Sequence, residues 1–109
     1  MFNYSYLSVF ILFLACTYDE PDLCYDQDPS FAECVIPIIQ DNCVSCHSYG
    51  GSAGFLDLSS YESIRNSVID GNLIDRINST ENPMPPSGKM SELTINIIKK
   101  WEENGAPNN

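Results

Sequence analysis

The chain has 109 residues, of which 15 are acidic and 5 basic, and its formal net charge is −10. This length allows at most one domain, and a hydrophobic content of 43% is sufficient for a packed core. Because phosphate binding requires lysine and arginine, the acidic balance excludes nucleic acid as a partner. The acidic side chains are expected first of all to keep the domain solvated, and they would also suit a basic docking surface on a partner protein.

The first 15 residues predict a signal peptide of the lipoprotein type. The apolar run over residues 7–15 carries no charge and is too short to span a bilayer. Cys16 follows it, and this order resembles the site at which bacterial lipoproteins are cleaved and lipidated. Two features differ from that pattern, because no basic residue precedes the run and Phe13 stands where leucine is usual. We expect export to the periplasm or cell envelope and a membrane anchor at Cys16; cleavage elsewhere and a buried helix are the alternatives.

Residues 16–30 predict a tether, and residues 31–109 predict the domain that it carries. The tether is rich in acidic residues and contains two prolines before residue 30, a composition typical of unpacked chain. A tether of this kind would let the domain reach partners near the membrane.

Two capping boxes predict the starts of helices in the domain. Ser30 and Glu33 precede apolar residues at helical spacing, which predicts a first helix that Pro37 delays or bends. Ser59 and Glu62 predict a second helix, which should end near residue 71 because a glycine stands there.

The rest of the domain predicts two further helices and an irregular loop. Residues 72–77 predict a short turn of helix, whereas the prolines of residues 82–88 exclude regular helix. Ser91 is expected to cap the last helix, whose apolar residues Leu93, Ile97 and Trp101 recur every four positions. No segment predicts a strand, so the expected fold class is all-α. Long loops in so small a domain need something to pack around, and a haem would serve.

The functional prediction rests on residues 43–47, which read Cys43-Val44-Ser45-Cys46-His47. Cys-x-x-Cys-His is the attachment signature of c-type haem. Each thiol can form a thioether with a haem vinyl group, and His47 then reaches the iron from the same turn. The alternatives are a thioredoxin-like motif, for which no βαβ pattern is found, a Cys43–Cys46 disulfide, and a zinc site.

The other cysteines bear on these alternatives. A zinc site needs four ligands, which Cys24, Cys34, Cys43 and Cys46 could supply, with His47 in place of one. The chain has no second Cys-x-x-Cys, so this signal is weak. If Cys16 carries the lipid and the two cysteines of the motif carry the haem, Cys24 and Cys34 remain. We expect them to pair in an oxidising compartment, with a free Cys24 as the alternative.

Met84 is the expected sixth ligand of the iron. His47 is the only histidine of the chain, so a second histidine ligand within it is excluded. Prolines flank Met84 and restrict its backbone, which leaves little entropy to lose when the thioether is held in place. Met90 fits a packing role better; it and an open or water-filled position are the alternatives. His/Met ligation raises the reduction potential and fills both axial positions, which favours electron transfer over catalysis.

From Phe31 onward the chain resembles the class I single-haem cytochrome c domain, and lipoprotein-anchored bacterial members look closest because of Cys16. The motifs that carry this resemblance, in order, are Val35-Ile36-Pro37-Ile38-Ile39, Cys43-Val44-Ser45-Cys46-His47, Asn82-Pro83-Met84-Pro85-Pro86, Ile97-Ile98-Lys99-Lys100-Trp101 and Gly105-Ala106-Pro107. Together they cover residues 31–107, most of the chain after the tether.

The resemblance implies an all-α fold in which the first and last helices, here residues 31–41 and 91–104, cross beside the haem. It implies that Trp101 packs at the crossing or at the haem edge, and that Met84 is the distal ligand. Many members have a proline soon after the histidine that orients it. This chain has none there, which leaves the partner of His47 undetermined. The candidate neighbours of the haem propionates are Arg65, Arg76 and Lys89.

These features predict an electron carrier, not an enzyme, that holds one covalently bound haem c and works with a redox partner protein. Whether the chain acts alone or within a larger oxidoreductase is left open. Two other functions are kept as alternatives. One is a haem sensor or peroxidase-like enzyme with an open distal site, and the other is a zinc-binding structural module.

Overall fold

The first helix of the domain begins with a widened turn. The computed structural model describes residues 24–25 and 28–109, so the predicted signal segment, Cys16 and most of the predicted tether lie outside the described residues. A π-helical segment, η1 (Phe31–Val35), continues directly into α2 (Ile36–Asn42). The Ser30 hydroxyl caps it by accepting the Glu33 N–H at 3.0 Å, as the first capping box predicts.

Pro37 explains the widened turn. The N–H of Val35 donates to the Ser30 carbonyl at 3.2 Å, and that of Ile36 donates to Phe31, so both bonds reach back five residues. Proline has no N–H to donate, and in an α-helix its ring clashes with the carbonyl four residues earlier. A wider preceding turn relieves this clash. The helical segment therefore begins at Phe31 and is not delayed by Pro37. Its first turn is wider than an α-helical turn, and this accommodates the proline.

The second predicted helix is α3 (Tyr61–Ile69), and its cap differs from the prediction. The cap is Ser60, whose hydroxyl accepts the Ser63 N–H at 3.2 Å. The hydroxyl of Ser59 instead donates to the carboxylate of Asp57, and Asp57 also accepts the Ser59 N–H at 2.9 Å. The cap lies one residue later than predicted because the Ser59 hydroxyl is already hydrogen-bonded to Asp57 in the preceding loop.

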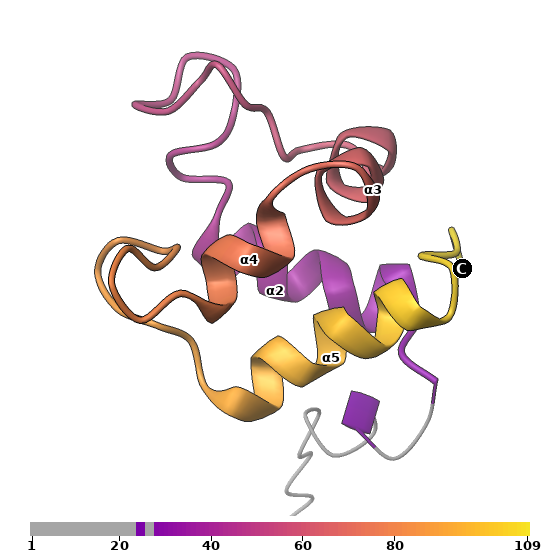
Figure 1. Ribbon diagram of the computed structural model, residues 1–109. Helices are drawn as coiled ribbons and strands as arrows, with labels where there is room; N and C mark the ends of the chain where they lie inside the picture. The colour runs from indigo at the N-terminus through magenta and orange to yellow at the C-terminus, as the bar shows by residue number, and fades with distance from the viewer. Residues whose placement is uncertain (1–23, 26–27) are drawn as a thin grey trace, which may run out of the picture.

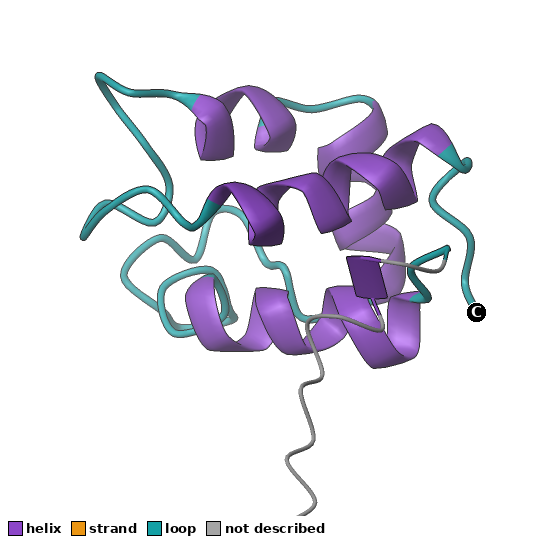
Figure 2. Cartoon of the chain, turned by 90° about the horizontal axis from the view of Figure 1, so that it is seen from below, coloured by secondary structure: helices purple, strands orange, loops and turns teal. Residues whose placement is uncertain are grey.

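Two further helices complete the domain. The short helix α4 (Leu73–Asn78) lies one residue beyond the predicted turn, and α5 (Glu92–Glu103) closes the fold. Ser91 caps α5 and accepts the Thr94 N–H at 3.2 Å. No strand occurs among the described residues (Figure 2), which confirms the all-α prediction.

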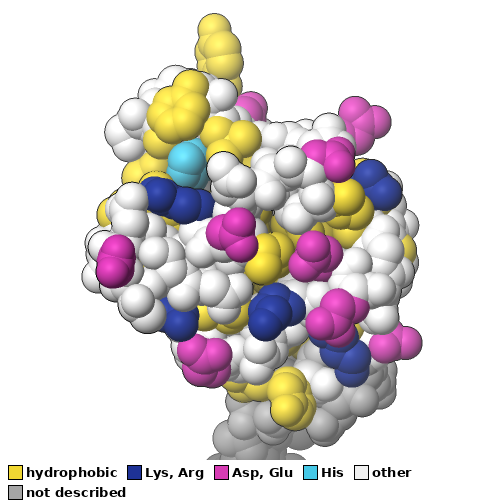
Figure 3. Space-filling view, viewed as in Figure 1, with side chains coloured by type: hydrophobic (Ala, Val, Ile, Leu, Met, Phe, Trp, Pro, Cys, Tyr) yellow, Lys and Arg dark blue, Asp and Glu magenta, His cyan; other side chains and the backbone are white. Residues whose placement is uncertain are grey.

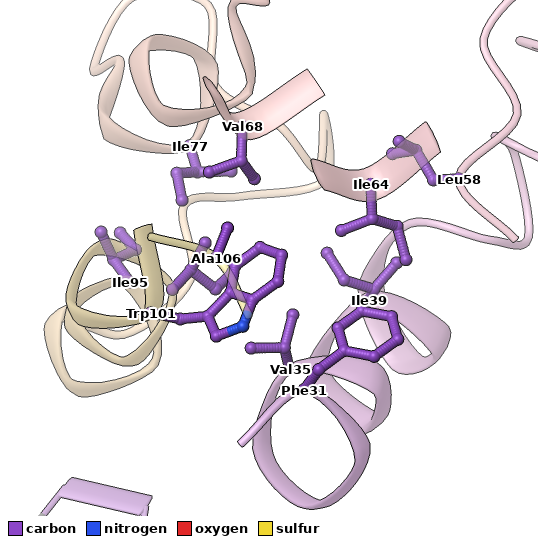
Figure 4. Packing of buried hydrophobic residues seen from close by; sticks show 11 residues of the cluster. Phe31, Val35, Ile39, Leu58, Ile64, Val68, Ile77, Ile95, Trp101 and Ala106 are labelled. Carbon is purple, nitrogen blue, oxygen red and sulfur yellow. The ribbon is translucent and has the colours of Figure 1, made fainter. Parts of the chain in front are cut away.

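The core lies between the first helix, α3, α4 and α5, which all contribute buried side chains (Figure 4). Trp101 is 0% exposed and stacks on Phe31 with ring centroids 5.6 Å apart. The Trp101 indole N–H donates to the Pro107 carbonyl at 2.9 Å, which ties the tail after α5 to the core. Trp101 thus occupies one of the two places expected for it, at the contact of the first and last helices. The predicted stripe on α5 missed Ile95, which is 0% exposed.

The end of the predicted tether packs against this body. Pro29 is buried, and Cys24 and Cys34 form a disulfide with an S–S distance of 2.02 Å. Asn104 donates its side-chain N–H to the Asp28 carboxylate at 3.3 Å. The packed part of the chain therefore begins before residue 31.

Two long loops leave the helices on the same side of the molecule. One joins α2 to α3 and contains residues 43–60, and the other joins α4 to α5 and contains residues 79–91. Figures 1 and 2, which differ by a rotation of 90°, both show the two loops on this side. The first loop carries the Cys-x-x-Cys-His motif and the second carries Met84.

Candidate functional site

The Cys-x-x-Cys-His motif forms a tight turn at the end of α2. The Cys43 and Val44 N–H groups both donate to the Ile39 carbonyl, at 2.9 and 3.2 Å. The His47 N–H then donates to the Cys43 carbonyl at 2.8 Å. One compact turn therefore carries both thiols and the imidazole. Both thiols are free.

The two thiols differ in environment. Cys43 is half-buried against the core, and burial raises the pKa of its thiol to about 11. Hydrogen bonds from Ser52 and Ser45 lower the pKa of the Cys46 thiol below its ordinary value. The Ser45 hydroxyl lies 3.9 Å from the Cys46 sulfur. Cys46 is therefore the thiol that ionises more readily.

His47 has a backbone partner that the sequence did not reveal. Its Nδ1 lies 3.2 Å from the carbonyl oxygen of Leu56, and its own carbonyl accepts the Leu58 N–H at 2.8 Å. An imidazole that donates its Nδ1–H to a carbonyl has a fixed ring orientation and a free Nε2, as metal-ligating histidines do. The Leu56 carbonyl is therefore the partner of His47 that the sequence left undetermined. No sequence signal could identify it, because any residue provides a carbonyl.

Glycine is required in the loop that returns from His47 to Leu56. The Ala53 N–H donates to the Cys46 carbonyl at 2.9 Å. A Cβ atom on Gly51 would lie only 2.4 Å from that same carbonyl oxygen. The loop therefore passes over the Cys46 carbonyl at a distance that only glycine permits.

Met84 is anchored to the end of α4. Its N–H donates to the Arg76 carbonyl at 3.1 Å, and its side chain is half-buried. The Met90 side chain packs against the core cluster, which agrees with its expected packing role. The loop that carries Met84 lies on the same side of the molecule as the loop that carries His47.

Apolar side chains that are only partly buried border the core near these loops. They include Val44, Leu56, Leu73, Ile74 and Met90. The donor types present, namely two free thiols, one imidazole and one thioether, are those that a haem c would need, and half-buried apolar side chains could cover part of such a group.

The predicted propionate neighbours differ in their surroundings. Arg65 and Arg76 are half-buried, on α3 and α4. Lys89 forms a surface ion pair with Glu92 at 3.2 Å.

The surface near His47 combines exposed aromatic side chains with a basic side chain that lies beside the histidine (Figure 3). Tyr49 and Phe55 are 98% and 92% exposed, and the Phe55 ring meets the His47 ring edge-to-face with centroids 6.3 Å apart. Figure 3 shows hydrophobic side chains beside the histidine, with acidic side chains spread over the rest of this face.

Two surface hollows border the motif region, because Val44 lines the smaller one and Leu56 lines the larger one. The larger, of about 530 Å³, runs along the polar side of α3 and is lined by residues that include Ser63, Asn66 and Asp70. The smaller, of about 130 Å³, lies between Ile36 and Tyr61. Neither is lined by His47 or Met84.

Cys24 and Cys34 are joined to each other and not to the motif. Their disulfide is the pairing that the sequence analysis favoured, and it removes two thiolates from the zinc alternative. Residues 24–25 and 28–109 contain no group of three or more His, Cys, Asp or Glu side chains placed to hold a metal ion. Within the same residues no helix has the length and apolar character needed to cross a membrane.

No family model, curated protein or solved structure matches this chain.

Proposed function

We propose that this protein is an electron carrier that holds a single haem c, attached through Cys43 and Cys46. The observation that carries the proposal is the hydrogen bond between His47 Nδ1 and the Leu56 carbonyl at 3.2 Å. It fixes the only imidazole of the chain, directly after Cys46, with Nε2 free to bind iron.

Each residue of the site has a distinct task in this proposal. The turn that begins at Cys43 holds the two thiols and the imidazole in one unit. Met84, on the second loop, supplies the distal thioether, and the flanking prolines limit its movement. When bound, the haem supplies a one-electron couple between ferrous and ferric iron. With both axial positions filled by the chain, substrate has no free site on the iron, which is why we propose a carrier rather than an enzyme.

We further propose that the protein is exported and that a lipid on Cys16 anchors it in the cell envelope. The apolar run over residues 7–15 and the cysteine that follows it support this proposal. The Cys24–Cys34 disulfide also suits an oxidising compartment. With a net charge of −10, the domain would be attracted by a redox partner with a basic docking surface.

The covalent attachment can be tested directly. The chain would be produced with a haem c maturation system, purified and denatured, and its optical spectrum and intact mass recorded. We expect haem to remain on the wild type and on Ser48→Ala, a control beside the motif. It should be lost from the double variant Cys43→Ser/Cys46→Ser. A haem-free wild-type chain, carrying zinc or a Cys43–Cys46 disulfide, would contradict the proposal.

The distal ligand needs a second measurement. Carbon monoxide binds rapidly to ferrous haem only where the distal position is open. We expect slow binding in the wild type, rapid binding in Met84→Ala, and wild-type behaviour in Met90→Ala. Rapid binding in the wild type would instead support the haem sensor or peroxidase-like alternative.

A further inference from the structure

The loop that carries Met84 folds back onto the last turn of α4. The Arg76 carbonyl accepts two backbone hydrogen bonds, from Ser79 N–H at 3.3 Å and from Met84 N–H at 3.1 Å. The first bond ends the helix, and the second fixes the backbone of Met84 against that end. The position of Met84 therefore depends on the path of the few residues between them.

A side chain controls that path. The Ser79 hydroxyl accepts the Asn82 N–H at 3.0 Å. Ser79 is half-buried and has extended backbone angles, φ −64° and ψ 136°, so the chain leaves the helix there. A serine hydroxyl that accepts a backbone N–H three residues later stabilises a tight turn in place of further helix. This turn brings the chain back to the Arg76 carbonyl two residues after Asn82.

We propose that Ser79 is a positioning residue for Met84: its hydroxyl closes the turn that holds the methionine in place as the distal ligand. This inference rests on the proposed function, in which Met84 binds the haem iron. Ser79 itself touches neither the iron nor the haem in this proposal. It acts through the Asn82 N–H and the bond from Met84 to Arg76.

The consequence is a change in how often the methionine leaves the iron. Without the Ser79 hydroxyl, the Asn82 N–H can donate only to water, so the closed turn loses one internal hydrogen bond. A typical net hydrogen bond corresponds to about a two- to tenfold change in the ratio of closed to open turn. An external ligand that competes with Met84 would bind more tightly by the same factor, because the open state is more populated.

The test is a titration of the oxidised, haem-loaded protein with imidazole, which replaces a weakly held methionine. The wild type would be compared with Ser79→Ala, Ser79→Thr, Ser87→Ala and Met84→Ala. Threonine keeps the hydroxyl, and Ser87 is an exposed serine of the same loop. The charge-transfer band of a methionine-bound ferric haem would be followed together with the apparent dissociation constant.

We expect Ser79→Ala to bind imidazole about two- to tenfold more tightly than the wild type and to show a weaker charge-transfer band. Ser79→Thr and Ser87→Ala should match the wild type. If Ser79→Ala loses stability to urea yet binds imidazole as the wild type does, its role is structural only and the inference is wrong. The same holds if Ser87→Ala has an equal effect.

Met84→Ala separates this inference from the proposed function. If this variant binds imidazole much more tightly than the wild type while Ser79→Ala does not, the inference on Ser79 fails and the ligand assignment stands. If Met84→Ala and the wild type bind equally, Met84 is not the ligand and both fail together.

Discussion

Gly51→Ala should disturb the turn of the Cys-x-x-Cys-His motif more than any change of comparable size in the same loop. An added Cβ would lie 2.4 Å from the carbonyl oxygen of Cys46 and 2.9 Å from its carbonyl carbon. Both atoms belong to the backbone and cannot rotate away, so the loop must move by about 0.6 Å to restore the 3.0 Å that real Cβ contacts keep. The Ala53 N–H, which donates to the same carbonyl at 2.9 Å, would be displaced with it.

The cost follows from these two effects. Overpacking a closely fitted site costs about 1–3 kcal/mol, and a lost hydrogen bond costs about 1 kcal/mol. We therefore expect the free energy of unfolding to fall by about 2–4 kcal/mol. A domain of this size has a stability of only about 5–10 kcal/mol, so the loss would be large.

Gly50→Ala is the matched control. Gly50 has φ +80°, but its Cβ would meet nothing within 4 Å. Its substitution by alanine should lower the free energy of unfolding only by the strain of a non-glycine residue in the left-handed region, about 1–2 kcal/mol.

Urea unfolding followed by the fluorescence of Trp101, the only tryptophan, would give both values. Haem loading in the maturation system would report the effect on the turn itself. If Gly51→Ala costs no more stability than Gly50→Ala and loads haem equally well, the close approach over Cys46 does not hold the turn and the reasoning is refuted.

Three further predictions concern the core and the thiols. Trp101→Ala should lower the free energy of unfolding by about 3–5 kcal/mol, because it empties the contact between the first helix and α5; a loss below 1 kcal/mol in urea unfolding would contradict this core assignment. Reduction of the Cys24–Cys34 disulfide, whose cysteines are 10 residues apart, should cost somewhat under ~3 kcal/mol, seen as a lower urea midpoint in the presence of a reductant. In the haem-free chain, iodoacetamide at mildly alkaline pH should modify Cys46 before Cys43, because burial raises the Cys43 pKa to about 11 while serine hydrogen bonds lower that of Cys46. Peptide mass mapping over time would check the order, and equal rates would count against it.

The sequence by itself determined the local features. The capping hydroxyls at Ser30 and Ser91 accept backbone N–H groups as predicted, whereas the cap of α3 is Ser60 and not the predicted Ser59. These bonds join residues three positions apart, so spacing alone reveals them. The motif Cys43-x-x-Cys46-His47 is likewise local, because one turn of chain holds all of its reactive groups.

The tertiary structure decided what depends on residues far apart in the chain. The acceptor for His47 is a backbone carbonyl nine residues away, and a carbonyl leaves no trace in the residue type. The contact of Trp101 with Phe31 joins the two ends of the domain, and the burial of Pro29 extends that domain into the predicted tether. Sequence patterns report periodicity along one element, whereas packing and backbone hydrogen bonds across loops depend on the path of the whole chain.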